Sequence, residues 1–269
     1  MIFQSKENYG ISDLLEIMVL LRSKDGCPWD REQTHTSIRK NLIEEAYEVA
    51  DAIDLNDPDL LQEELGDLLL QVVFHSRISE EAGGFDINNV ADQICKKLII
   101  RHPHIFADVI ANNSQEVLDN WDEIKKREKG QTTASETLHS VPKVLPALMR
   151  SQKVQKRAGK AGLDYEDISQ AIGDLESEIK EVKEAIASGN KSRYKEELGD
   201  LLFSAVNVSR LLKVDAEEAI TEACNKFINR FEKVENLAVK GGVDMKGAPM
   251  NVLNKLWDEV KTSESSEVK

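Results

Sequence analysis

The sequence predicts an all-α protein, a tandem repeat of two helical-bundle domains. Apolar residues recur at helical spacing along most of the chain, and only six of its 269 residues are proline. No segment reads convincingly as a strand. The string EELGDLL occurs twice, as Glu63–Leu69 and Glu196–Leu202, an offset of 133 residues. An identical string at this length, with a matching pair upstream, indicates two copies of one structural unit.

The first unit is expected to contain five helices, at about residues 10–24, 34–53, 58–81, 87–101 and 114–129. Asp25–Asp30 is expected to be a turn, and His102–His104 a loop around Pro103. Asp57 is expected to cap the third helix, because it is followed by Pro58, a residue favoured at the first helical position.

The second unit is expected to repeat this scheme, with helices at about residues 145–160, 167–188, 191–213, 215–239 and 249–262. The segment 130–143 is polar and has no period, so it is expected to be a linker. The predicted domains are therefore residues 1–130 and 144–262. The tail from Thr262 onward is expected to be disordered.

The composition limits the classes of partner and compartment. The net charge of −14 argues against binding to nucleic acid or to an anionic membrane. The three cysteines are scattered, which is typical of a reducing compartment without disulfides. The N-terminus lacks the pattern of a signal peptide, and no apolar run is long enough to span a bilayer. We therefore expect a cytoplasmic protein that does not contact membranes.

Each EELGDLL string follows an E-x-x-E pair at the same distance, so each unit carries four acidic residues in one arrangement. In the first unit these are Glu45, Glu48, Glu64 and Asp67, and in the second Glu178, Glu181, Glu197 and Asp200. Acids three residues apart share one helix face, and two helices joined by a short connection pack antiparallel. The four carboxylates would then face one another, which is costly unless a cation neutralises them. Oxygen ligands select Mg²⁺, with Mn²⁺ as a substitute, and such a cation implies a phosphate-bearing ligand.

Other interpretations of these residues are less favoured. An isolated E-x-x-E is usually a solvated helix face, but both pairs here are embedded among apolar residues. A di-iron bundle needs Glu-x-x-His motifs, and none occurs at these sites. The five histidines and three cysteines are expected to be structural or incidental rather than zinc ligands.

Together, six segments resemble the all-α nucleoside triphosphate pyrophosphohydrolases, and in particular the two-copy MazG family. They are CPWDREQTH, NLIEEAYEV, EELGDLLLQVVFHSR, RHPHIF, LPALMRSQKVQKRA and EELGDLLFSAVNVSR. The resemblance covers most of the chain. It implies a hydrolase acting on acid anhydrides, which cleaves a nucleoside triphosphate to the monophosphate and pyrophosphate with Mg²⁺, and it implies a homodimer.

The resemblance also implies roles for individual residues. The metal ligands would be the eight acids above, with catalysis at Glu178, Glu181, Glu197 and Asp200. The nucleotide contacts would be Arg193, Glu196, Lys226, Arg230, Trp257 and Lys261, with possible counterparts in the first copy at Lys97, Arg101, Trp121 and Lys125. The family motif opens with two adjacent glutamates, whereas the second copy has Ser177 before Glu178. Either Glu178 or Glu181 would orient or deprotonate the attacking water.

The second copy is expected to be the principal site. Lys191, Arg193 and Lys195 precede its EELGDLL string, where the first copy has Pro58, Leu60 and Gln62. This additional positive charge suits a triphosphate. Two other function classes fit the sequence: a non-catalytic sensor of nucleotide and Mg²⁺, and an acidic helical interaction protein. A pyrimidine-specific hydrolase is a narrower alternative.

Overall fold

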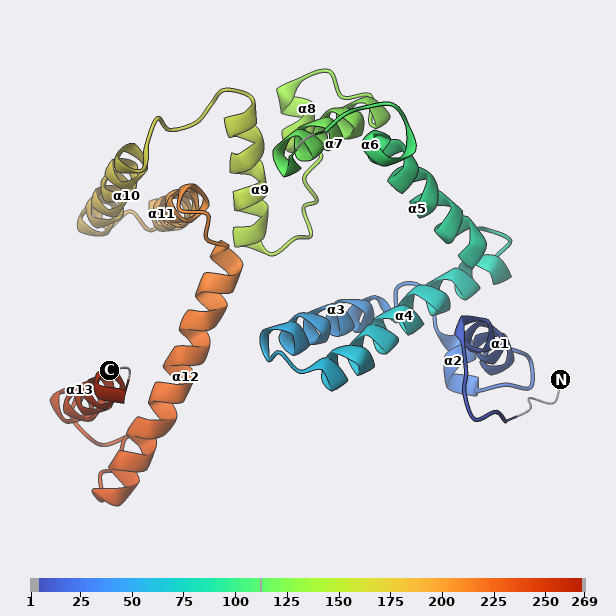
Figure 1. Ribbon diagram of the computed structural model, residues 1–269. Helices are drawn as coiled ribbons and strands as arrows, with labels where there is room; N and C mark the ends of the chain where they lie inside the picture. Colours follow the sequence, from blue (N-terminus) through green and yellow to red (C-terminus); the bar gives the residue numbers. More distant parts are fainter. Residues whose placement is uncertain (1–4, 112, 268–269) are drawn as a thin grey trace. The chain divides into compact units, whose positions relative to one another are not determined.

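The computed structural model describes residues 5–111 and 113–267, and every regular element in these ranges is an α-helix (Figure 1). The predicted all-α fold is confirmed. The helices are α1 (Ile11–Leu21), α2 (Pro28–Glu32), α3 (Arg39–Asp54), α4 (Pro58–Glu81), α5 (Ile87–Arg101), α6 (Pro103–Phe106), α7 (Ser114–Glu128), α8 (Ala134–His139), α9 (Ala147–Lys160), α10 (Ile168–Ser188), α11 (Lys191–Leu211), α12 (Ala216–Lys240) and α13 (Met250–Glu267). None of these helices is both long enough and apolar enough to cross a bilayer.

The chain divides into two compact units, Met1–Lys125 and Lys126–Lys269, with the boundary inside α7. Each unit is built around a long pair of neighbouring helices, α3 with α4 in the first and α10 with α11 in the second (Figure 1). The two EELGDLL strings lie in α4 and α11. The predicted tandem repeat is therefore confirmed.

The connections within the two helix pairs are equivalent. Asn56 and Gly189, which are 133 residues apart, both have left-handed backbone, with φ of 52° and 68°. Glycine adopts this conformation without strain, and asparagine tolerates it better than most residues. Asp57 then caps α4 by accepting a hydrogen bond from the backbone N–H of Leu60 at 3.1 Å, as predicted. Asn190 caps α11 in the same way.

The core of the first unit lies where α1 and the start of α3 meet α4. Its buried residues are Met18, Ile38, Val73 and Phe74, with Leu14, Leu15, Leu70, Ile78 and Ile87 packed around them. Among the described residues of the second unit, the buried apolar side chains are all valine or alanine: Val141, Ala171, Ala185, Val206, Ala216, Val234, Ala238 and Val260. Many large apolar side chains remain exposed, and Leu65 and Leu198, at equivalent places, are 49% and 48% exposed.

Two short helices start at prolines in segments expected to be irregular. Pro28 opens α2 inside the expected turn, and Pro103 opens α6 inside the expected loop, so both expectations are wrong there. Proline is favoured at the first helical position because its missing N–H has no partner to lose there. A single turn has too little periodicity to be recognised in the sequence.

The expected linker also contains a helix, α8. It begins with a capping box: Glu136 accepts a hydrogen bond from the backbone N–H of Thr133 at 3.0 Å, and Thr133 accepts one from that of Glu136 at 3.2 Å. The T-x-x-E signature of this cap is visible in the sequence. Arg157 of α9 donates a hydrogen bond to Ser140, just after α8, at 2.8 Å. The segment is therefore part of the second unit and packs against α9.

The last helix, α13, extends through Glu267, so the expected disorder from Thr262 onward is wrong for residues 262–267. Residues 268–269 lie outside the described residues. Glu264 accepts hydrogen bonds from Arg230 at 2.7 Å and from Lys233 at 3.0 Å, both on α12. This double ion pair joins the end of α13 to α12.

A buried arginine ties the elements of the first unit together. Arg22, at the end of α1, is 8% exposed. It donates a hydrogen bond to Glu81 at the end of α4 at 2.8 Å and another to the backbone carbonyl of Gln33 at 3.3 Å. Burial alone would raise the pKa of Glu81, but hydrogen bonds from Arg22 and Arg77 outweigh it and lower the pKa overall.

We predict that Glu81→Gln destabilises the first unit by about 2 kcal/mol, because the buried charge of Arg22 loses its carboxylate. Since the folded-state pKa of Glu81 is depressed, its contribution is present above the unfolded value of about 4.3 and is lost as pH falls through the folded value. Urea unfolding of wild type and variant from pH 7 downward would measure this. A constant difference across the acid range would contradict the prediction.

Candidate functional site

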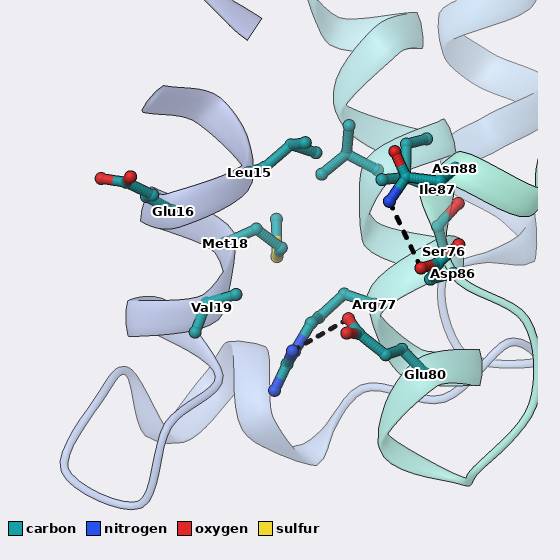
Figure 2. A pocket seen from close by; sticks show the side chains of 11 residues that line it. Leu15, Glu16, Met18, Val19, Ser76, Arg77, Glu80, Asp86, Ile87 and Asn88 are labelled. Carbon is teal, nitrogen blue, oxygen red and sulfur yellow. Dashed lines mark hydrogen bonds and ion pairs between the residues drawn. The ribbon is translucent and has the colours of Figure 1, made fainter. Parts of the chain in front are cut away.

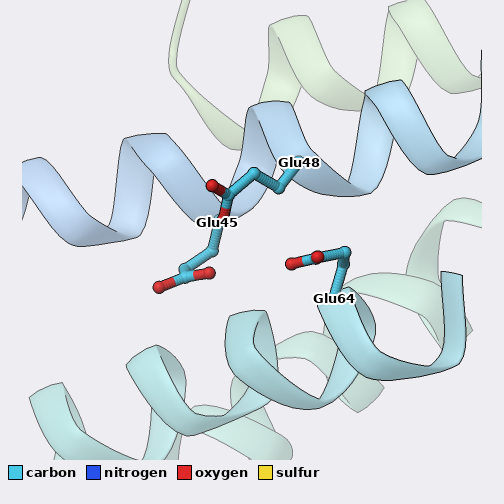
Figure 3. Close-up of side chains that lie close together, drawn as sticks. All are labelled: Glu45, Glu48 and Glu64. Carbon is cyan, nitrogen blue, oxygen red and sulfur yellow. The ribbon is translucent and has the colours of Figure 1, made fainter. Parts of the chain in front are cut away.

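The first carboxylate cluster lies between α3 and α4. Glu45 and Glu48 project from α3 toward Glu64 on α4 (Figure 3). One carboxylate oxygen from each of these three residues lies within 4.8 Å of the others. Asp67 is outside this group of three, but its charge helps to raise the pKa of Glu45 and Glu64. The structure thus gathers the four predicted acids of the first unit.

The second cluster lies at the equivalent place between α10 and α11. Glu178, Glu197 and Asp200 each offer an oxygen atom within 4.8 Å of the others. Glu181 is outside this group, although its charge is the largest contribution from a neighbour to the raised pKa of Glu178. In both units, carboxylates of the E-x-x-E helix therefore face carboxylates of the E-x-x-D helix, as expected.

Burial and like charge both act on these acids. Burial is the largest cause of the raised pKa of Glu45, Glu64 and Glu178, and neighbouring carboxylates raise each of them further. A hydrogen bond between Glu45 and Glu48 adds to the rise at Glu45. Clustered, partly buried oxygen ligands of this kind suit a hard divalent cation, which would relieve the repulsion between them. The residues present therefore fit Mg²⁺ or Mn²⁺.

The clusters differ in their cationic neighbours. Arg193 donates hydrogen bonds from Nε, at 2.9 Å, and from Nη2 to the same oxygen, Oε1, of Glu197. In the part of the chain that the structure describes, no ion pair involves Glu45, Glu48, Glu64 or Asp67. The other predicted cations, Lys191 and Lys195, are exposed, as is Glu196.

Four of the expected nucleotide contacts of the second unit, Lys226, Arg230, Trp257 and Lys261, lie on α12 and α13. Arg230 pairs with Glu264, and the ring of Trp257 lies 5.3 Å from that of Phe227. Lys226 is exposed on α12, and Lys261 lies on α13. Contacting a triphosphate would require Arg230 to exchange its carboxylate for phosphate oxygens.

In the first unit the counterparts lie around one aromatic ring. Arg101 and Lys125 each place their positive charge 5.7 Å from the centroid of Trp121, and His102 meets the ring edge-on at 4.9 Å. Lys97 is exposed on α5. The ring expected to stack on a base therefore already holds two cation–π contacts.

A network next to Glu178 includes four residues that the sequence interpretation did not single out, Asp164, Tyr165, Asp174 and Arg210. Tyr165 donates a hydrogen bond to Asp174 at 2.6 Å, and the charge of Asp174 contributes to the raised pKa of Glu178. Arg210 joins Asn207, at 2.9 Å, to Asp164, at 3.0 Å. The available signal was the spacing of Asp174, one helical turn before Glu178.

A cavity of about 360 Å³ in the first unit lies apart from the carboxylates (Figure 2). It opens between α1, α4 and the start of α5, with Met18 and Val73 among its apolar lining and the Arg77–Glu80 ion pair on its rim. None of the four clustered acids lines it.

In the second unit, Gln152 of α9 bridges to the backbone of Val214 and Ala216.

Comparison with known proteins gives consistent matches to one family. The profile described as "MazG nucleotide pyrophosphohydrolase domain" matches the chain twice, over residues 33–106 and 167–235. Each matched segment contains one of the two carboxylate clusters.

Several curated proteins are similar over most of the chain. An Escherichia coli K12 protein named "Nucleoside triphosphate pyrophosphohydrolase" is 43% identical over 259 residues, which cover 94% of this chain and 98% of that protein. A Thermotoga maritima protein named "Nucleoside triphosphate pyrophosphohydrolase/pyrophosphatase MazG" is 42% identical over 249 residues, covering 93% and 94%. The Bacillus subtilis "Uncharacterized protein YabN" is 44% identical over 245 residues, covering 91% of this chain and 50% of that protein.

We predict that Glu178→Gln raises the melting temperature in EDTA by about 2 °C, because it removes one of several mutually repelling carboxylates. In millimolar Mg²⁺ together with a triphosphate analogue whose α–β bridge is a methylene group, the order should reverse, since the variant loses a ligand for the cation. Differential scanning calorimetry with and without Mg²⁺ tests this.

Glu176→Gln is the matched control, because Glu176 is exposed on the same helix and is not one of the clustered acids. It should behave like wild type in both buffers. A lower melting temperature for Glu178→Gln in EDTA would contradict the idea that the cluster is under electrostatic repulsion.

Proposed function

The chain belongs to the MazG nucleotide pyrophosphohydrolase family, and from this we propose that it hydrolyses nucleoside triphosphates to the monophosphate and pyrophosphate. The observation that carries the proposal is the presence, in each matched segment, of a carboxylate cluster on a helix pair. Such clusters bind the cations that accompany triphosphates. The chain would therefore act as a hydrolase on the anhydride bond between the α- and β-phosphates.

We propose Mg²⁺ as the physiological cation, with Mn²⁺ as a substitute. Glu178, Glu181, Glu197 and Asp200 would hold it in the second unit, and Glu45, Glu48, Glu64 and Asp67 in the first. When bound, the cation would supply charge neutralisation at the phosphates and a water of lowered pKa. Within the protein, Glu178 or Glu181 would orient the attacking water, since both lie on the face of α10 turned to α11.

The cationic residues would then bind and orient the substrate. Arg193 sits beside the second cluster and Arg230 on α12, and an arginine can hold two phosphate oxygens with its planar donors. Lys226 and Lys261 would add positive charge for the leaving pyrophosphate, Glu196 would lie beside the nucleotide, and Trp257 would stack on the base. Arg230 must leave Glu264 to do this, so substrate binding would loosen the α12–α13 ion pair.

We propose the second unit as the principal catalytic site. Its cluster contains a nearly buried acid, Glu197, which is 4% exposed, and has Arg193 directly beside it. The guanidinium of Arg193 gives this cluster a positive charge that can hold phosphate oxygens. In the first unit Leu60 occupies the position of Arg193, so that cluster lacks a neighbouring cation for the triphosphate.

We further propose that the protein forms a homodimer. Leu69 and Leu202, at equivalent places on α4 and α11, are 38% and 58% exposed, in addition to the exposed Leu65 and Leu198. Exposed apolar residues that recur on the central helix pairs of both units are typical of an interface. Sedimentation equilibrium would test this proposal independently of catalysis.

We predict that Glu178→Gln lowers pyrophosphate release about a hundredfold, because the second site loses a cation ligand, while Glu45→Gln lowers it less than about threefold. Release would be measured with Mg²⁺ across the eight common ribo- and deoxyribonucleoside triphosphates, which also reports any pyrimidine preference.

Glu176→Gln again serves as the control and should retain wild-type release. If Glu45→Gln were the more damaged variant, the principal site would lie in the first unit. If wild type released no pyrophosphate from any nucleotide yet bound nucleotide with Mg²⁺, the protein would be a sensor rather than an enzyme. If it did not bind Mg²⁺ at all, the acidic interaction protein would be favoured.

A further inference from the structure

The two carboxylate clusters differ at one neighbouring position, which is positively charged in the second unit and uncharged in the first. Arg193 lies four residues before Glu197, and Leu60 lies four residues before Glu64, at the equivalent place. Two donors of Arg193 converge on Oε1 of Glu197, whose side chain is 5% exposed, whereas that of Arg193 is 40% exposed. A nearly buried carboxylate is thus neutralised by a guanidinium that reaches it from the surface.

Helix stability does not explain an arginine at this position. Arg193 is the third residue of α11, where the positive end of the helix dipole disfavours cations. An arginine that precedes glutamate by four residues is also the less favourable order for a helical ion pair. The first unit has an uncharged residue, Leu60, at the third position of α4. The placement of Arg193 is therefore better explained by the cluster than by the helix.

The position of Arg193 sets up a competition. A divalent cation bound by Glu178, Glu197 and Asp200 would approach the oxygen atoms that these residues bring within 4.8 Å of one another. A guanidinium on Oε1 of Glu197 repels that cation and competes with it for the Glu197 carboxylate. Arg193 must therefore leave Glu197 when the metal enters. A triphosphate beside the cluster would give the released guanidinium an anionic partner.

We propose that Arg193 makes metal binding at the second cluster depend on nucleotide, whereas the first cluster binds a free divalent cation on its own. The inference rests on the proposed function, because it takes the triphosphate as the alternative partner of Arg193. In the first unit Leu60 cannot compete for the metal, and none of the ion pairs among the described residues involves Glu45, Glu48, Glu64 or Asp67. The first site would therefore bind a free cation, and the second a cation together with a nucleotide.

The same coupling acts in both directions. If nucleotide releases Glu197 for the metal, then metal must raise the affinity for nucleotide by the same factor. The second site would bind a cation together with a triphosphate. When only free cation is present, Arg193 would remain bound to Glu197 and prevent the cation from binding. The first site would be filled at cation concentrations that leave the second site empty.

The test measures Mn²⁺ binding to the full-length protein by electron paramagnetic resonance of the free ion. Glu45→Gln leaves the second cluster intact, and Glu178→Gln leaves the first. Each is titrated alone and with a triphosphate analogue whose α–β bridging oxygen is a methylene group, so that no hydrolysis occurs. We expect the analogue to strengthen Mn²⁺ binding about tenfold in the Glu45→Gln protein and less than about threefold in the Glu178→Gln protein.

Exchange of the distinguishing residue provides the decisive variants. In the Glu45→Gln protein, Arg193→Leu should strengthen binding of Mn²⁺ without nucleotide about tenfold and remove most of the effect of the analogue. Arg193→Lys keeps one positive charge but loses the paired donors, so its affinity for Mn²⁺ without nucleotide should lie between those of the proteins with Arg193 and with Arg193→Leu. In the Glu178→Gln protein, Leu60→Arg should weaken binding of free Mn²⁺. Circular dichroism melts check that each variant is folded, and leucine and lysine are both good helix formers.

The proposal is overturned if Arg193→Leu leaves the affinity for free Mn²⁺ unchanged or weakens it in a folded protein. It is also overturned if the second cluster binds no Mn²⁺ with or without the analogue. Pyrophosphate release by wild type separates this outcome from failure of the proposed function. If wild type releases pyrophosphate but Arg193→Leu does not change Mn²⁺ affinity, only the role of Arg193 is rejected. If Mn²⁺ binds as expected but wild type releases no pyrophosphate, only the proposed hydrolysis is rejected.

Discussion

The rest of each unit depends on holding four carboxylates against their mutual repulsion on two neighbouring helices. Burial and neighbouring charge both raise the pKa of Glu45, Glu64 and Glu178, so the fold accepts an electrostatic cost at these places. The helix pair is fixed by a left-handed residue in the connection, Asn56 or Gly189, and by a capping side chain after it. Functional sites commonly give up stability in this way.

The sequence was sufficient for the long helices because their apolar spacing extends over several turns, and the repeat of 133 residues supported each assignment with a second copy. It failed at α2, α6 and α8, which are too short to show a period, although the Thr133–Glu136 box marks the start of α8. It also failed at the end of α13, which looks like a polar tail until Glu264 is seen against α12.

In the candidate site, too, some features could be predicted from the sequence and others could not. The acids could be predicted because residues three apart on one helix share a face, and a short connection turns the next helix back toward it. The pairing of Arg230 with Glu264 and the contacts of Trp121 with Arg101 and His102 could not, because they join separate helices or their ends. Arg230 and Glu264 are 34 residues apart in the sequence. The Arg193–Glu197 pair is local, so its spacing was visible, but its burial was not.

The ion pairs at the end of α13 have a practical consequence for handling the protein. The stretch TSESSEVK looks dispensable, and a cut after residue 261 would be a natural choice for trimming or for attaching a fusion partner. Such a cut would remove Glu264 and leave Arg230 and Lys233 without their shared carboxylate, on the helix that carries the expected phosphate contacts. A purification tag is better joined through a flexible spacer beyond residue 267, where it leaves this ion pair intact.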